Sequence, residues 1–332
     1  MLRESKYYLA RVGVCLMTVA LIVGIAGCFA SQPENLEIRT WYDLDAIRNN
    51  LSAHYILMND LDSTTAGYVE MAGPTANEGK GWHPIVGAGG SPSFTGTFDG
   101  QGYKIRDVYI NLPGIGYVGL FSILGEGGVI QNIAMVNANV TCTAYAGGVV
   151  GANLGTVSYS YFAGSVSSLN WAGGLVGFNS EGATVGGSYS TGNITSDYGA
   201  GGLAGANGGT VSSCYSTSSV TGNAGVGGLL GANNGTVNNS YSTGRVSGST
   251  NVGGLVGYSE GTVNNSFWDV QTSGQSISDG GTGLSTSQMK SISTFLAAGW
   301  NIVAVGSLGD RDPAYVWNIV NGVSYPFLGW QP

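Results

Sequence analysis

The sequence has few charged residues. Asp, Glu, Lys and Arg make up 9% of its 332 residues, whereas an ordinary soluble domain has about 25%. Low charge usually accompanies burial, but Ser, Thr and Asn are abundant throughout and there are 58 glycines. This composition favours short strands and tight turns over helices. A Gly- and Ser-rich chain can also be disordered, but the regular return of Leu, Val, Ile and Tyr argues against disorder.

Basic residues are the scarcer of the two charged kinds. Eleven Lys and Arg face nineteen Asp and Glu, which gives a formal net charge of −8, and the charge becomes −10 without residues 1–27. A chain this acidic repels polyanions. Nucleic acid and anionic lipid are therefore disfavoured as partners.

Histidine and cysteine are also scarce. The two histidines, His54 and His83, do not lie in an HExxH sequence, which excludes a zinc metallopeptidase of that kind. Beyond residue 28 only Cys142 and Cys214 remain, at different phases of the repeat described below. We expect two separate buried thiols rather than a disulfide, and no redox or metal cofactor.

The N-terminus is typical of a targeting segment. Three basic residues, Arg3, Lys6 and Arg11, precede a short apolar run, Val12–Ile25. The sequence Ile25-Ala26-Gly27-Cys28 then resembles a bacterial lipobox. This pattern predicts a signal peptide over residues 1–27, then a lipidated Cys28 and a tether over residues 28–35. The alternative is an uncleaved N-terminal membrane anchor, although the apolar run is short for a spanning helix. Both interpretations place the rest of the chain outside the cytoplasm.

The chain repeats itself from residue 147 onward. The start-to-start spacings of the related segments are 26, 28, 26 and 26 residues. The segments are GGVVGAN at Gly147, GGLVGFN at Gly173, GGLAGAN at Gly201, GGLLGAN at Gly227 and GGLVGYS at Gly253. A period in the twenties indicates a stacked architecture in which each repeat contacts its neighbours.

Counting from each leading glycine aligns the repeats into columns. The polar column is Asn153, Asn179, Asn207 and Asn233. Stacked Asn side chains at an inward turn hydrogen-bond to one another, so we expect a ladder. The aromatic column is Tyr161, Tyr189, Tyr215, Tyr241 and Phe267. Because it runs in phase with columns of Val, we expect these rings in the core. The second repeat has two extra residues near Ser180-Glu181, which we expect to bulge a single turn.

Each period contains three short apolar patches separated by Gly, Asn and Ser turns, which indicates a coil with three faces. Stacked coils then pair in parallel along each face, with a rise of about 4.8 Å per coil. The predicted fold class is all-β, a parallel β-helix (β-solenoid). Capping boxes at Thr40–Asp43 and Ser285–Gln288 predict short helices that cap both ends. We therefore expect an N-terminal cap and divergent coils over residues 36–146, repeats over 147–272 and a C-terminal cap over 273–332.

The repeat resembles the GLUG motif, named for its Gly-Leu-(Val/Leu)-Gly core. The copies are Gly174–Gly177, Gly228–Gly231 and Gly254–Gly257, with Gly148–Gly151 and Gly202–Gly205 as weaker ones. The resemblance implies a right-handed parallel β-helix on a bacterial or archaeal surface lipoprotein. Proteins with this motif include adhesin-like chains and immunoglobulin-A-specific metallopeptidases. The resemblance implies no catalytic residues, because the motif carries none.

Carboxylates are the remaining candidates for chemistry. Glycoside hydrolysis needs two carboxyl groups about 5–9 Å apart, and Glu181, Asp197 and Glu260 occupy different phases or turns of the repeats. The best acidic grouping precedes the repeats: Asp60 and Asp62, with Asp99. Calcium binds such oxygen ligands, which makes these residues a weak calcium candidate. The alternative is that they cap backbone amides in turns.

These observations predict a non-enzymatic, lipid-anchored cell-surface β-helix that serves adhesion, ligand presentation or a scaffold. The expected partners are the membrane, through the lipid anchor, and a glycan or surface-protein ligand. The chain is expected to be monomeric. One alternative is a carbohydrate-active β-helix enzyme, resembling polysaccharide lyases or hydrolases, with its site in the loops from Asp60 to Asp99. Another is a non-catalytic module of a larger surface assembly.

Overall fold

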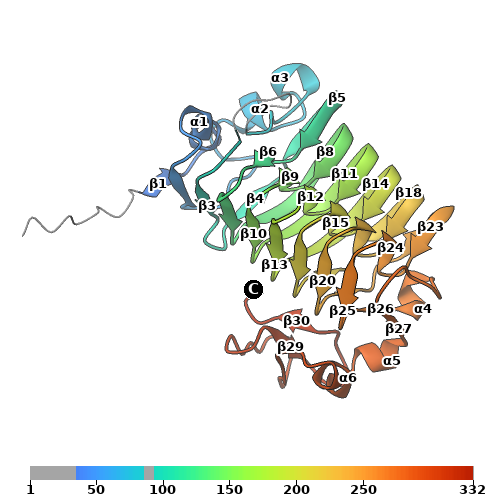
Figure 1. Cartoon of the computed structure of the whole chain (residues 1–332). Coiled ribbons are helices and arrows are strands. Elements are labelled where there is room, and N and C mark those ends of the chain that lie inside the picture. The colour runs from blue at the N-terminus through green and yellow to red at the C-terminus, as the bar shows by residue number, and fades with distance from the viewer. Residues whose placement is uncertain (1–34, 86–92, 332) are drawn as a thin grey trace, which may run out of the picture. The chain divides into compact units, whose positions relative to one another are not determined.

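Successive turns of the chain stack on one another to form a parallel β-helix (Figure 1). The structure is a computed structural model and describes residues 35–85 and 93–331. The all-β fold class predicted from the repeats is confirmed. The predicted signal peptide, Cys28 and all of the tether before Asn35 lie outside the described residues.

Within the described residues the coils build three sheets, whose neighbouring strands are parallel throughout. The first sheet contains β1 (Asn35–Ile38), β2 (His54–Leu57), β3 (Thr97–Asp99), β7 (Val129–Gln131), β10 (Thr156–Ser158), β13 (Thr184–Gly186), β16 (Thr210–Ser212), β20 (Thr236–Asn238) and β25 (Thr262–Asn264). The second contains β4 (Lys104–Arg106), β5 (Tyr109–Val118), β8 (Ala134–Gly147), β11 (Tyr161–Gly173), β14 (Tyr189–Gly201), β17 (Tyr215–Ser216), β18 (Ser219–Gly227), β21 (Tyr241–Ser242), β22 (Val246–Ser247), β23 (Thr250–Gly253), β26 (Phe267–Asp269) and β27 (Thr282–Leu284). The third contains β6 (Phe121–Leu124), β9 (Val150–Asn153), β12 (Val176–Asn179), β15 (Ala204–Asn207), β19 (Leu230–Asn233) and β24 (Val256–Ser259).

Coils stack in register, so equivalent residues of successive repeats pair directly. On the first sheet Val157 pairs with Val185, which pairs with Val211, and all three side chains are fully buried. The interior is narrow where the second and third sheets meet. A Cβ on Gly202 would lie 2.2 Å from the carbonyl oxygen of Gly228 in the next coil. The leading glycines of the motif are therefore required by close backbone approach.

The polar column forms a continuous hydrogen-bonded ladder inside the coils. Asn153 Nδ2 donates to Asn179 Oδ1 at 2.7 Å, Asn179 Nδ2 donates to Asn207 Oδ1 at 2.7 Å, and Asn207 Nδ2 donates to Asn233 Oδ1 at 2.8 Å. Asn233 Nδ2 in turn donates a hydrogen bond to Ser259 Oγ at 3.1 Å. The four Asn side chains are at most 2% exposed, so each depends on its neighbours for its hydrogen bonds.

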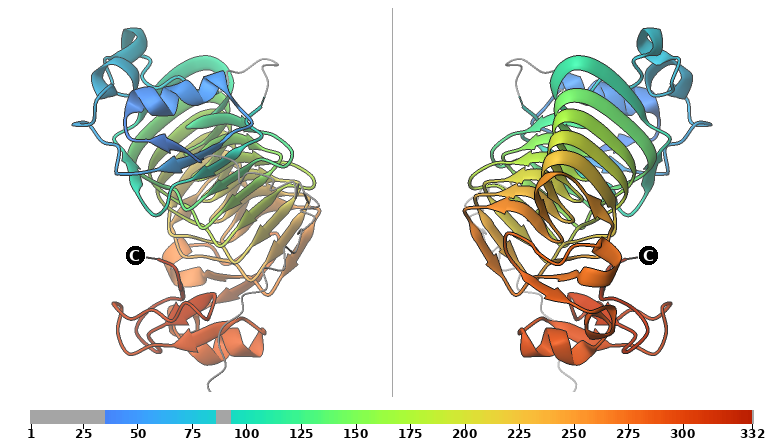
Figure 2. Two further views of the ribbon diagram at one scale, coloured as in Figure 1. Left: turned by 90° about the vertical axis from the view of Figure 1, so that its left-hand side faces the viewer. Right: turned by 90° about the vertical axis from the view of Figure 1, so that its right-hand side faces the viewer.

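A small helical cap closes the N-terminal end. Helix α1 (Trp41–Ala46) and the 3₁₀ helix Ile47–Asn49 lie across the first coil (Figure 2), and Trp41 and Leu44 are fully buried. The capping box predicted at Thr40 and Asp43 is confirmed. Two further short helices, α2 (Tyr68–Met71) and α3 (Ala76–Gly79), follow in the connection to β3.

The C-terminal region does more than cap the last coil. Helix α4 (Val270–Ser273) follows β26, Gly254 N donates to Ile277 O at 2.9 Å, and β27 pairs with β26. Residues 285–331 then lie beside the stack, not over its end (Figure 2). We call this segment the C-terminal lobe. Its elements are α5 (Thr286–Met289), whose predicted capping box is confirmed, α6 (Ile292–Ala297), β28 (Ile302–Ala304), β29 (Trp317–Ile319) and β30 (Phe327–Leu328).

The lobe packs on the aromatic column. Tyr161, Tyr189, Tyr215 and Tyr241 stack with centroid separations of 4.8, 4.8 and 5.0 Å, and Trp317 of the lobe lies 5.7 Å from the Tyr241 ring. The expected burial is found for Tyr215, Tyr241 and Phe267, which belong to a second hydrophobic core between the coils and the lobe. Tyr161 and Tyr189 are half-buried, and the column lies outside the interior of the coils. Side chains alternate along a strand, so the next residue of each strand faces inward instead. The inward residues are Phe162, Ser190, Ser216, Ser242 and Trp268.

The Asn ladder gives a first testable prediction. Asn207→Ala removes the partner of Asn179 Nδ2 and of Asn233 Oδ1, both inside the coils. Since each unsatisfied buried polar group costs about 1–3 kcal/mol, we expect the free energy of unfolding to fall by about 2–4 kcal/mol, measured by urea denaturation. The control is Asn234→Ala at the adjacent exposed position. Equal effects of the two substitutions would show that the ladder contributes little.

The Tyr column gives a prediction for alkaline pH. Burial raises the pKa of Tyr189 to about 12 and raises the pKa of Tyr215 and Tyr241 as well. Unfolded Tyr ionises near pH 10, so the stabilisation from burying neutral rings is complete below pH 10 and is lost as the pH rises towards the folded-state pKa values. Circular dichroism and tyrosinate absorbance, followed together, should change cooperatively above pH 10. Full ionisation near pH 10 with the fold intact would contradict this burial.

Candidate functional site

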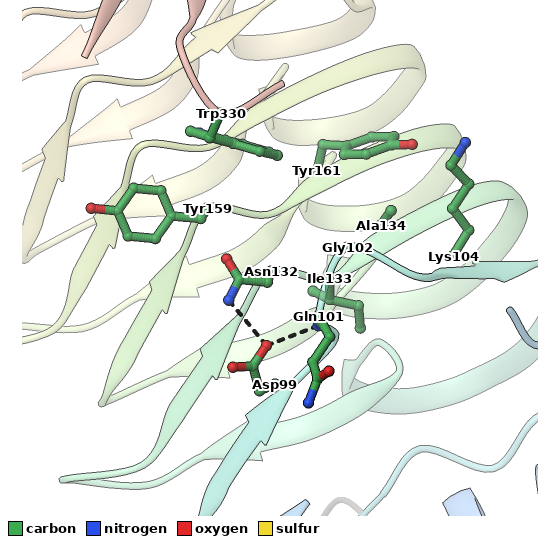
Figure 3. A pocket seen from close by; sticks show the side chains of 10 residues that line it. All are labelled: Asp99, Gln101, Gly102, Lys104, Asn132, Ile133, Ala134, Tyr159, Tyr161 and Trp330. Carbon is green, nitrogen blue, oxygen red and sulfur yellow. Dashed lines mark hydrogen bonds between the residues drawn. The ribbon is translucent and has the colours of Figure 1, made fainter. Parts of the chain in front are cut away.

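A cleft opens beside the N-terminal end of the Tyr column. Its volume is about 430 Å³, and three successive coils and the end of the C-terminal lobe line it (Figure 3). The lining residues are Asp99, Gln101, Gly102, Lys104, Asn132, Ile133, Ala134, Tyr159, Tyr161 and Trp330. We call it the Tyr161 cleft.

Aromatic rings form one wall of the Tyr161 cleft. Tyr161 stacks on Tyr189 with one face of its ring. In the preceding coils Ala134 and Lys104 occupy the equivalent positions, so the column has no further ring there and the other face of Tyr161 is left to the cleft. Trp330 lies next to this column, at 5.9 Å from the Tyr189 ring.

Trp330 is held in place by contacts with two coils. Its indole Nε1 donates to Gly187 O at 2.8 Å, and its ring meets Tyr159 edge-on at 6.3 Å and 89°. Tyr159 itself is 51% exposed and has a left-handed φ of 49°. Bulky residues rarely adopt that conformation. The resulting turn leaves the Tyr159 ring exposed, and the ring lines the cleft.

Polar groups form the opposite wall, as Figure 3 shows for Asp99 and Asn132. Asp99 Oδ1 accepts hydrogen bonds from Gln101 N at 2.8 Å and from Asn132 Nδ2 at 3.0 Å, and its Oδ2 accepts one from Gln131 Nε2 at 2.9 Å. These bonds fix the carboxylate but leave acceptor sites, because the two oxygens together offer about four. Lys104 adds an ammonium donor to the lining.

The three acidic residues predicted from the sequence are not brought together. Asp60 accepts a hydrogen bond from Lys104 N at 2.9 Å and lies 3.6 Å from Arg106 Nε. Hydrogen bonds from Thr64 and Thr65 hold Asp62 in a turn and lower its pKa. In residues 35–85 and 93–331 no group of three or more His, Cys, Asp and Glu side chains is placed to hold a metal ion. Of the three carboxylates, Asp99 alone lines the Tyr161 cleft.

Both cysteines in the described chain stand in columns of serine. Cys142 aligns with Ser168 of the next coil. Cys214 belongs to a second serine column, where its backbone N donates a hydrogen bond to Ser240 Oγ at 3.1 Å. Both thiols are free and buried, as predicted. Burial raises the pKa of Cys214 to about 12, so this thiol is not an activated nucleophile.

Most of the cleft was not predicted from the sequence. Tyr161 and Asp99 were singled out, but as a core ring and a calcium candidate. Lys104, Asn132 and Trp330 were not. Trp330 is 143 residues from Gly187, and no repeat or motif connects the two positions.

Comparisons with known proteins agree with the fold. A crystal structure of a candidate immunoglobulin A1 protease from Bacteroides ovatus superposes with a TM-score of 0.64 and 19% identity, over 91% of this chain and 94% of that one. No family model matches the chain. The structural likeness defines a protein of the parallel β-helix class.

Two curated proteins are similar in sequence over part of their length. Halomucin of Haloquadratum walsbyi is 36% identical over 145 residues, which cover 42% of this chain and 2% of halomucin. A candidate Gly-rich membrane protein of Evansella cellulosilytica is 33% identical over 125 residues, which cover 36% of this chain and 13% of that protein. The chain thus matches only a small part of each of these much longer relatives.

Proposed function

We propose that the protein is a surface-located β-helix that binds saccharides, without turning them over, in the Tyr161 cleft. The observation that carries the proposal is the open face of the Tyr161 ring opposite the fixed carboxylate of Asp99. A sugar has an apolar face of C–H groups, which packs on an aromatic ring, and hydroxyls at its edge, which hydrogen-bond to charged and amide groups. The cleft offers both kinds of contact at once.

A location at the cell surface is supported by the names of the relatives, one a halomucin and the other a membrane protein. The N-terminal pattern adds lipidation at Cys28 as the mode of attachment. No helix in residues 35–85 or 93–331 is long and apolar enough to cross a membrane. On the N-terminal pattern alone, we propose attachment through the N-terminal segment, with the GLUG-type coils outside the cytoplasm.

Two alternatives remain open to test. The first is a carbohydrate-active β-helix enzyme with its site in the loops from Asp60 to Asp99. Among the described residues that line the cleft there is a single carboxylate, Asp99, whereas glycoside hydrolysis uses two. The second alternative is a non-catalytic module of a larger surface assembly, which the far greater length of both sequence relatives supports.

The binding site is testable with the full chain in a detergent that lacks sugar groups. We expect binding on a glycan array, with affinity for the bound glycan reduced about tenfold or more by Tyr161→Ala or Trp330→Ala, since a central aromatic anchor contributes over 1 kcal/mol. Tyr198→Ala, at an exposed ring outside the cleft, is the control. Unchanged affinity in both cleft variants would refute the site.

The same glycans are incubated with the protein and analysed for shortened or unsaturated products. We expect none. Product formation that Asp99→Asn abolishes would establish the enzyme instead of the binding protein.

Attachment is testable by fractionation. Cys28→Ala removes the thiol that a lipid would modify, so we expect the protein to move from the membrane fraction to the soluble extracytoplasmic fraction when expressed in a bacterium. If the variant stays in the membrane fraction, the uncleaved anchor is the correct interpretation.

A further inference from the structure

A second hollow lies on the outer surface of the third sheet, at the opposite end of β11 from Tyr161. It has a volume of about 620 Å³. The side chains that matter here are Trp171, Phe178, Glu181, Ala206, Ala232 and Asn234. We call it the Trp171 groove.

Trp171 ends a second ladder of aromatic rings. Tyr117 stacks on Tyr145 at 4.8 Å and 13°, and Tyr145 lies parallel to Trp171 at 6.5 Å and 9°. In the next coil the equivalent residue is Gly199. A Cβ there would lie 2.0 Å from Trp171 Cε3. The indole therefore reaches into space that the missing side chain leaves, and the ladder stops at the groove.

The position of this ladder tolerates residues other than aromatics. All of its members have left-handed backbone, with φ of 52°, 50° and 59° for the three rings and 72° for Gly199. Gly225 and Asn251 continue the same position with φ of 66° and 52°. Glycine and asparagine adopt this conformation readily, whereas bulky residues do not. The corner turn of the coil thus does not need a tryptophan.

Two further departures from the repeat meet Trp171 in the same groove. Phe178 occupies a column in which both neighbours, Ala152 and Ala206, are alanine. The two-residue insertion of the second repeat places Glu181 in a turn that Gly182 completes with φ of 78°. Ala206 and Ala232 form the floor between these walls. Coils without these features fold in the same register, so the fold does not require any of the three.

We propose that the Trp171 groove is a second binding site, for an uncharged saccharide chain. The rings of Trp171 and Phe178 would contact the apolar faces of the sugars, and Glu181 and Asn234 would hydrogen-bond to hydroxyls. Glu181 is the one charged residue among the described residues that line the groove. Because it is negative, as is the whole chain, an anionic polymer is disfavoured.

This site is independent of the Tyr161 cleft and does not rest on its function. The two share strand β11 but no lining residue. Glycan contact at both ends of one strand would let a single chain hold two polysaccharide segments, which raises avidity when both are engaged.

The test uses the full chain in a detergent without sugar groups and measures binding of xylohexaose, cellohexaose and chitohexaose by calorimetry. To isolate the groove, every variant also carries Trp330→Ala. We expect at least one neutral oligosaccharide to bind, and Trp171→Ala to weaken that binding about tenfold or more. Trp171→Phe should retain most of the affinity, and Glu181→Gln should weaken it less than Trp171→Ala does.

Tyr117→Ala is the matched control, because it removes a ring from the other end of the same ladder without altering the groove. Melting temperatures show whether each variant folds. If Tyr117→Ala weakens binding as much as Trp171→Ala does, the ladder acts only on stability. Absence of binding by all three oligosaccharides, or preferential binding of hexagalacturonate or of a proline-rich peptide, would overturn the proposal. If the wild-type chain binds an oligosaccharide and the chain with Trp330→Ala alone does not, the cleft accounts for all of the binding, which also overturns the proposal.

Discussion

In-register stacking of coils is the constraint from which the other features follow. Parallel strands about 4.8 Å apart bring equivalent residues of successive repeats into direct contact, so each position of the repeat becomes a column. The residue type at each position must therefore be able to pack against copies of itself in the neighbouring coils. Asn meets this condition through its amide, as between Asn179 and Asn207. Tyr meets it through parallel rings, and Val through dispersion contacts in a closed interior. Positions where two sheets converge are left to glycine.

The same constraint explains why a site can form where the residue type of a column changes. Where a column of rings ends, the last ring has no further ring stacked on it. This occurs at Tyr161, next to Ala134, and at Trp171, next to Gly199. Both residues belong to β11, at its two ends. The binding surfaces that we propose are thus produced by the ends of columns, whereas the columns themselves stabilise the fold.

The sequence predicted the features that are local and periodic. The period, the three-faced coil, the Asn column and both capping boxes depend on spacing alone. The orientation of the Tyr column was not predicted, because Tyr189, Tyr215 and Tyr241 are each followed by a buried Ser, and two of them lie in strands of only two residues. So short a segment shows no alternation from which to assign a face. The packing of Trp330 on Gly187 was not predictable either, since it joins distant segments. Phe178 and Glu181 were detectable as departures from their columns, although their convergence with Trp171 requires the structure.

The C-terminal lobe changes the mechanics of the β-helix. In a stack where each coil contacts only its neighbours, the ends fray and unfolding proceeds coil by coil. The lobe contacts Tyr189, Tyr215 and Tyr241, which belong to three successive coils. It therefore connects these coils to one another through a second set of contacts. None of these coils can separate from the next without also breaking its contact with the lobe. Coils that would otherwise yield one at a time under tension are joined into a single cooperative block, in a protein whose proposed role is to hold a ligand while tethered to a cell.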